Sequence, residues 1–137
     1  MSPRLRIDLD REEYRLGDTV KGKVVALSGG NSRSLEVWLD YREKTKDYNE
    51  VGATVEHPTL NDGPIVEGAS FDFELTLPLD GYPNYKSEHG ELWWELNVKS
   101  DEPGRDTRER RRIEVGAARA GSGGSLGSRG PVTGRGF

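Results

Sequence analysis

Residues 71–77 (FDFELTL) and 92–98 (LWWELNV) decide the fold, because each has an apolar residue at every second position. A period of two places these apolar side chains on one face of each extended strand. A sheet with one apolar face buries that face, usually against a second sheet. The pattern therefore predicts a β-sandwich whose interior contains Phe71, Phe73, Leu75, Leu77, Leu92, Trp94, Leu96 and Val98.

Similar patterns elsewhere predict further strands at 4–10, 19–28, 34–42 and 47–56, and an edge strand at 106–115. Gly22 lies in mid-strand, where glycine marks a bulge or the close approach of another group. Residues 11–15 and 57–68 are expected to be connections without strands. About seven antiparallel strands in little more than one hundred residues are typical of an immunoglobulin-like sandwich.

The chain divides by composition into a folded domain, 1–115, and a tail, 116–137, in which eight of 22 residues are glycine. Such a tail buries too little to order itself, so we expect a flexible, disordered coil. The net charge is −4, and the three arginines after residue 115 leave −7 for the folded domain. An acidic domain repels phosphate backbones, which argues against nucleic acid as a partner.

Other classes of site are excluded or disfavoured by what the sequence lacks. There are no cysteines, so disulfides, thiolate zinc sites and cysteine nucleophiles are excluded. The first residues, MSPR, lack the apolar run of a signal peptide, and no stretch has the length of a membrane span. We expect a cytoplasmic protein with no membrane span.

Two motifs resemble those of a known family. Residues 14–24 (YRLGDTVKGKV) resemble the Y-x-x-G-D-x-V-x-G-x-V stretch of the arrestin-like superfamily. The later run FELTLP, followed by Pro83, Tyr85 and LWWELNV, is similar to a pattern in arrestin N-terminal domains and bacterial sporulation-control proteins. The resemblance covers most of residues 4–115. It implies an arrestin-like sandwich that acts as an adaptor for an unidentified protein partner.

This chain also departs from that family. Its relatives carry two sandwiches in tandem, and these residues have room for one. The first strand has no paired lysines like those with which arrestins detect receptor phosphates. The resemblance therefore carries over a fold and a general role, but no ligand site, and it leaves the oligomeric state open.

No catalytic or metal-binding constellation stands out, so we expect no enzyme, no cofactor and no metal. The acidic residues near the first turn match no calcium-loop spacing. His57 and His89 have no motif partner for metal binding or nucleophile activation. These carboxylates and histidines are interpreted as solvated surface groups. The acidic residues are Asp8, Asp10, Glu12, Glu13 and Asp18.

Aromatic residues are the strongest candidates for function. Trp38 and Trp93 have the register opposite to the apolar faces of their strands, so both are expected to point outward. With Tyr82 and Tyr85 they form the candidate protein-binding surface. The alternative is that the tryptophans pack on long neighbouring side chains such as Arg42 or Lys99.

These observations leave three functional hypotheses. The first is a non-catalytic interaction module that uses an outer sheet face or an edge strand. The second is a carbohydrate-binding module with exposed aromatics on one flat face, and the third is a hydrolase with an unrecognised acid in a cleft. The arginine-rich run 105–112 is consistent with polyanion binding, but charges on an edge strand also prevent sheets from associating.

Overall fold

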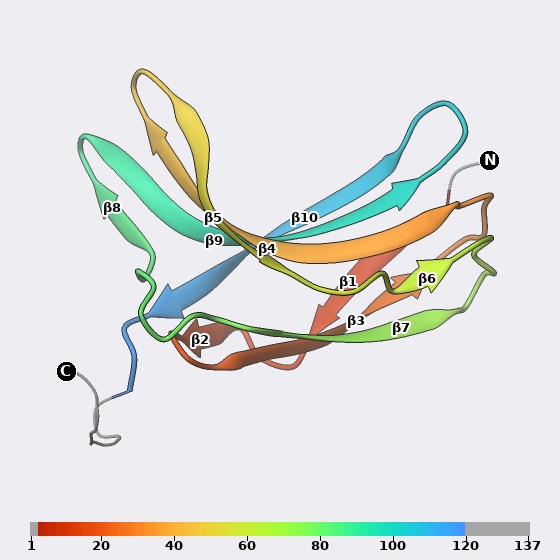
Figure 1. The fold of residues 1–137 in the computed structure, drawn as a ribbon, viewed down its shortest axis with the longest axis horizontal. Coiled ribbons are helices and arrows are strands. Elements are labelled where there is room, and N and C mark those ends of the chain that lie inside the picture. Colours follow the sequence, from red (N-terminus) through yellow and green to blue (C-terminus); the bar gives the residue numbers. More distant parts are fainter. Residues whose placement is uncertain (1–2, 120–137) are drawn as a thin grey trace.

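Two stacked β-sheets make up the part of the chain that this computed structural model describes, residues 3–119 (Figure 1). The predicted all-β sandwich is confirmed, and the seven strands of five or more residues are the seven that the sequence predicted. The strands are β1 (Leu5–Leu9), β2 (Glu13–Arg15), β3 (Thr19–Ala26), β4 (Ser34–Thr45), β5 (Asn49–Glu56), β6 (Asn61–Asp62), β7 (Ser70–Thr76), β8 (Tyr85–Ser87), β9 (Gly90–Asp101) and β10 (Thr107–Gly116).

The smaller sheet has three antiparallel strands in the order β1-β3-β7. Gly22 lies in the middle of β3, directly opposite Leu9 on β1 and Phe73 on β7. A Cβ atom at Gly22 would lie 2.4 Å from the Asp8 carbonyl oxygen and 2.9 Å from the Phe73 ring. The close approach expected at this glycine is therefore confirmed.

The larger sheet follows the order β2-β10-β9-β4-β5, with β6 paired to β4 and β8 paired to β9. Its centre is the antiparallel pair β4–β9, in register from Ser34–Asp101 to Thr45–Gly90. From Thr107 to Ile113, β10 pairs only with β9, so this stretch is an edge as predicted.

Alternating side chains from both sheets meet in one apolar core. Trp94 is 1% exposed at its centre, which confirms the position predicted from its register. The other buried apolar residues are Leu5, Ile7, Tyr14, Leu16, Val20, Val24, Ala26, Leu35, Val37, Leu39, Tyr41, Ile65, Phe73, Leu75, Leu77, Leu96, Val98, Ile113 and Val115.

Three short strands, β2, β6 and β8, lie where the sequence predicted connections. Each has two or three residues, which is too short to show a period. Two of them have partners distant in the sequence: β2 pairs in parallel with the end of β10, and β6 pairs with the start of β4. β8 pairs with the neighbouring start of β9. The prediction of connections at 11–15 and 57–68 was wrong at these points.

A bulge alters the faces of β5. Ala53 lies opposite Tyr41, but the next pair is Val51 with Arg42, so Gly52 is an extra residue in the strand. The bulge moves Val51 to the outer face of the sheet, although its spacing from Ala53 suggested a shared face.

The last strand, β10, ends at Gly116, one residue beyond the end of the folded domain predicted at 115. The next residues still contact the sandwich: the Gly116 carbonyl accepts a bond from the Leu16 nitrogen, and Arg119 pairs with Asp18 at 3.3 Å. Residues 120–137, the rest of the predicted tail, lie outside the described residues.

The larger sheet extends further than the smaller one. In Figure 1 the β4–β5 and β8–β9 hairpins rise away from β1, β3 and β7 at the upper left. The inner face of the larger sheet is therefore covered by the smaller sheet over one part and uncovered at this end.

Candidate protein-binding surface

Trp38 and Trp93 both lie on the outer face of the larger sheet, as their register predicted. Trp38 is opposite Asn97, and Trp93 is opposite Arg42. The pair Asp40–Glu95 lies between these two rows, so the tryptophans are roughly 13 Å apart along the strands. Both side chains are half-buried, and they do not form one continuous aromatic patch.

Trp38 belongs to a polar cluster. Its Nε1 donates a hydrogen bond to Asp40 Oδ2 at 3.1 Å. Asp40 also accepts hydrogen bonds from Asn97 Nδ2 at 3.2 Å and from Thr54 Oγ1 at 2.9 Å. These bonds satisfy a buried carboxylate and hold the indole in place, so they give Trp38 a structural role.

The ring of Trp93 is covered by an arginine. The Arg112 guanidinium carbon lies 4.9 Å from the ring centroid, and Arg112 also pairs with Glu91. The hydrogen bond from Arg112 lowers the pKa of Glu91. A long cationic side chain was expected to pack on the ring, and Arg112 from β10 does so. The two side chains suggested from the sequence have other partners: Arg42 bonds Asn49, and Lys99 pairs with Asp106.

The two tyrosines lie on the opposite face of the sheet. Tyr85, on β8, is opposite Leu92, which faces inward with Trp94. Tyr82 precedes β8 and stacks on Tyr41, with ring centroids 6.4 Å apart. The four aromatics were predicted as one surface, and the structure divides them between two faces. The reason is that β8 pairs with the start of β9, which places Tyr85 opposite the inward-facing Leu92.

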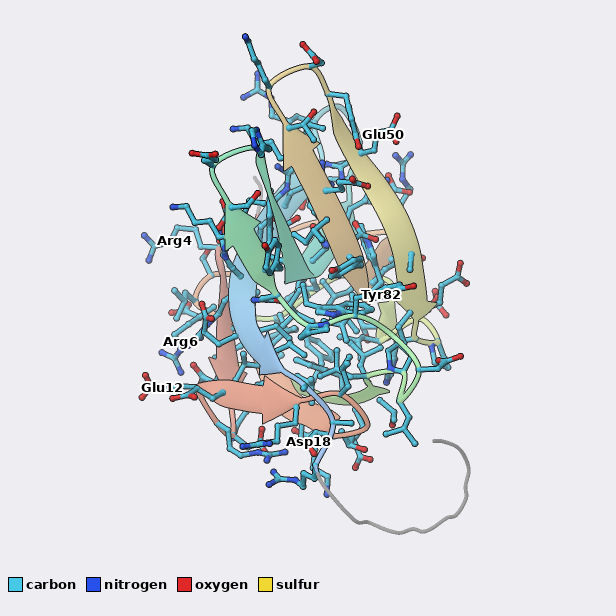
Figure 2. All side chains as sticks on the ribbon, turned by 90° about the vertical axis from the view of Figure 1, so that its left-hand side faces the viewer. Arg4, Arg6, Glu12, Asp18, Glu50 and Tyr82 are labelled. Atoms are coloured by element: carbon cyan, nitrogen blue, oxygen red, sulfur yellow. The ribbon has the colours of Figure 1, made fainter. Side chains whose placement is uncertain are left out.

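An open pocket of about 530 Å³ lies at the uncovered end of the inner face. We call it the aromatic pocket. Figure 2 looks toward this end, where Tyr82 lies below the hairpin that carries Glu50 and above the turn at Asp18. The pocket is lined by Tyr41, Glu43, Gly52, Ala53, Pro78, Asp80, Gly81, Tyr82, Leu92 and Trp94.

Hydrogen bonds fix the loop that forms one wall of this pocket. Trp94 Nε1 donates to the Tyr82 carbonyl at 2.9 Å, and Tyr41 Oη donates to the Pro83 carbonyl at 3.0 Å. Asn84 Nδ2 donates to the Ile113 carbonyl, while Asn84 Oδ1 accepts from the Trp94 nitrogen. The loop is therefore tied to β4, β9 and β10, so the pocket is pre-formed.

Acidic residues supply all the charge in the pocket lining. Glu43 and Asp80 line it, and no lysine or arginine does. Within residues 3–119, neither carboxylate has a lysine or arginine nitrogen within 4 Å. Burial, with smaller contributions from Glu43 and Tyr82, raises the pKa of Tyr41. The pocket thus combines aromatic rings with negative charge.

The remaining candidates have structural partners or are solvated. His57 Nδ1 lies 2.7 Å from the Pro58 carbonyl, and its Nε2 accepts from the Glu74 nitrogen, so it joins the end of β5 to β7. His89 is exposed beside Glu88. Asp8 pairs with Arg6, and Asp18 pairs with Arg11. Between residues 3 and 119, no group of three histidine, aspartate or glutamate side chains is placed to hold a metal ion.

Part of the arginine-rich run is also engaged within the fold. Arg111 Nη1 donates to the Ile7 carbonyl at 2.9 Å and so links β10 to the smaller sheet. Arg112 is held by Glu91 and Trp93, as described above. These contacts support the interpretation of the run as part of a protected sheet edge.

The fold has a counterpart among solved structures. The chain is similar to the crystal structure of Spo0M, a sporulation control protein from Bacillus subtilis, with a TM-score of 0.69 and 22% sequence identity. The match covers 86% of this chain and 51% of Spo0M, so the chain spans about half the length of that protein. The arrestin-like fold expected from the sequence motifs is confirmed.

No protein-family model matches the chain, and no curated protein matches it. In the described part of the chain, no helix has the length and hydropathy needed to cross a membrane. The cytoplasmic location expected from the sequence stays a prediction.

Proposed function

We propose that this sandwich is a non-catalytic adaptor or regulator that binds a partner protein in the aromatic pocket. One observation carries the proposal: three large apolar side chains, Leu79, Tyr82 and Tyr85, are 70%, 70% and 62% exposed at the same end of the sandwich. Apolar side chains gathered on a surface mark interaction sites in soluble proteins. Tyrosine is also enriched among the residues that dominate interface energetics.

The inner face supports this function better than the outer face does. Trp38 and Trp93 already have partners within the fold, whereas Tyr82 presents a largely free ring beside an open pocket. The edge strand β5 supplies Gly52 and Ala53 to the same pocket. A partner segment therefore has both an apolar pocket and a strand edge available, as in recognition by strand addition.

Site-specific cross-linking tests the proposal. Leu79, between the pocket residues Pro78 and Asp80, is 70% exposed, and Val66 is 71% exposed, so they form a matched pair beside and away from the pocket. Each is replaced by a photoreactive benzoylphenylalanine in full-length protein, and cells are irradiated. A defined protein cross-linked at position 79 but not at 66, and lost on Tyr82→Ala, supports the proposal. Equal capture at both positions, or none at 79, contradicts it.

The outer-face hypothesis makes the reverse prediction for the same purified partner. A Trp38→Ala, Trp93→Ala double variant would lose binding, while Tyr82→Ala would retain it. For the pocket, Tyr82→Ala is expected to weaken binding by about tenfold or more, as for an aromatic residue central to an interface.

The carbohydrate-binding hypothesis has less support, since Trp38, Trp93 and Tyr82 do not share one flat face. A glycan array decides between the two functions. A signal that Tyr82→Ala abolishes would replace the adaptor proposal, and a silent array would remove the carbohydrate hypothesis.

A further inference from the structure

We infer that the aromatic pocket accepts an arginine side chain from an extended peptide segment of the partner, with the peptide backbone alongside β5. This inference rests on the proposed function and specifies its partner. It is argued from the charges of the pocket, from arginine contacts elsewhere in the molecule, and from the edge of β5.

Within residues 3–119, three carboxylates at this end of the molecule, those of Glu43, Glu50 and Asp80, have no lysine or arginine nitrogen within 4 Å. Glu43 lies on β4 directly opposite Glu50 on β5, so two like charges face each other on the inner side of the hairpin. Like charges at directly opposite positions destabilise a strand pair. Asp80 adds a third carboxylate from the wall of the pocket. A cation bound between these groups would relieve the repulsion.

Within the part of the chain that the structure describes, the Glu43 side chain accepts one hydrogen bond, from Tyr48 Oη at 2.7 Å. This bond, together with smaller effects of nearby charge, raises the pKa of Tyr48. A carboxylate has acceptor sites for several donors, so Glu43 can still bind a guanidinium. The bond to Tyr48 also positions the carboxylate within the hairpin.

The molecule already holds two arginines in the arrangement that we infer for the pocket. Arg112 stacks on Trp93 and pairs with Glu91, and Arg11 lies 4.8 Å from the Tyr14 ring centroid and pairs with Asp18. Each set combines an arginine, an aromatic ring and a carboxylate. The aromatic pocket supplies the rings and the carboxylates of such a set, and the partner peptide supplies the arginine.

Tyr82 suits a guanidinium because its ring is largely free. Arginine is planar, stacks on aromatic faces and binds carboxylates with two parallel bonds, whereas lysine is a compact charge that does neither as well. The occupant that satisfies both the ring and the carboxylates is therefore arginine.

The edge of β5 supplies the backbone part of the site. β5 is the last strand of the sheet, and residues 51–55 (VGATV) contain no charge. The free edge of β10, in contrast, carries Arg108, Arg110, Arg111 and Arg112 over five residues. Charged side chains discourage pairing at an edge, so of these two edges β5 is the one open to a partner strand.

The test uses a displayed library of random heptapeptides bound to the full-length protein. Peptides that contain one arginine beside apolar residues are expected to be enriched. The leading peptide is then synthesised with arginine or with citrulline, which keeps the shape of arginine without its charge. Citrulline is expected to weaken binding about tenfold or more, as charge-assisted hydrogen bonds are lost.

A variant with Glu43→Gln and Asp80→Asn is expected to reduce the difference in affinity between the arginine and citrulline peptides to about threefold or less, because it removes the charges that favour arginine. A variant with Asp62→Asn and Glu67→Gln, which likewise removes two negative charges but at exposed positions away from the pocket, is the control and should leave the difference unchanged. Thermal unfolding of each variant checks that the fold is kept.

Each outcome distinguishes this inference from the proposed function. If peptides bind in a Tyr82-dependent way but without preference for arginine, the inference is wrong and the adaptor proposal stands. If no peptide is retained, or citrulline binds equally well, the inference is also overturned. If the free protein forms a dimer that Tyr82→Ala dissociates, a second copy of the chain occupies the pocket instead.

Discussion

The covered and the uncovered parts of the larger sheet differ although the same strands form both. Along β4, the inward residues Leu35, Val37 and Leu39 are almost completely buried beneath the smaller sheet. Further along the same face, Tyr41 remains mostly buried and Glu43 is only half-buried. The inward side chain thus changes from aliphatic to aromatic to charged as the cover ends.

This change follows from what each part must satisfy. Where two sheets meet, every atom is removed from water, so purely aliphatic side chains are favoured. Where the cover ends, a tyrosine buries its ring and bonds through its hydroxyl, as Tyr41 does with the Pro83 carbonyl. The covered part therefore supplies stability, whereas the uncovered part leaves aromatic and charged side chains open to solvent.

The largest expected effect lies in the covered part. Leu39 is fully buried, so Leu39→Ala should lower the free energy of unfolding by about 2–5 kcal/mol, through lost burial and a new cavity. Leu79→Ala, at the uncovered end, should change it by about 0.5 kcal/mol or less. Urea unfolding of both variants measures the two losses of unfolding free energy. Similar losses would contradict the assignment of stability to the covered part.

A second change tests close packing in the smaller sheet. Gly22→Ala should destabilise the fold by about 1–3 kcal/mol, because the added methyl group would overlap the Asp8 carbonyl oxygen. Gly116→Ala is the matched control, since nothing lies within 4 Å of a Cβ atom there. Thermal unfolding should separate the two variants, and equal melting temperatures would contradict the packing described for β3.

A third change affects both stability and binding. Asn84→Ala removes the side chain that bonds the Ile113 carbonyl and the Trp94 nitrogen, at a cost of about 1–2 kcal/mol. The pocket wall should also loosen, so the affinity for the peptide should fall even under conditions in which the variant remains fully folded. Calorimetric titration with the selected peptide measures it. Unchanged affinity would show that the loop is not part of the site.

The smallest effect concerns Tyr14, whose Oη donates to Asp10 at 2.7 Å. Burial, followed by this bond, raises the pKa of Tyr14 to about 12. Since the folded pKa lies above the unfolded value, the stabilisation is complete below about pH 10 and is lost as the pH rises toward 12. Absorbance titration should show an ionisation near pH 12 that Tyr14→Phe lacks. Identical curves for the two proteins would contradict the assignment.

Much of the fold could be predicted from the sequence. The alternation in 71–77 and 92–98 indicated which face of each strand is buried, and Trp94 lies where its register placed it. The short strands β2 and β6 could not be predicted, since their partners are distant in the sequence. β8 pairs with the neighbouring start of β9, but its three residues are too few to show a period. The bulge at Gly52 likewise depends on how β5 pairs with β4.

The candidate site was predicted only in part. Tyr82 and Tyr85 were predicted as candidate binding residues together with Trp38 and Trp93, which lie on the other face. No signal in the sequence showed that Arg112 would cover Trp93, because these residues meet across two strands. The pairing of Glu43 with Glu50 was not predicted, because Glu43 lies beyond the strand predicted at 34–42 and no turn was predicted between the two strands.

The sequence by itself determined the class of fold and the composition of the core, because the alternation of apolar residues is a local property of each strand. Only the tertiary structure decided that one sheet outreaches the other and leaves Tyr82 beside an open acidic pocket. That outcome depends on the relative lengths and offset of two sheets, which are set by contacts between distant segments.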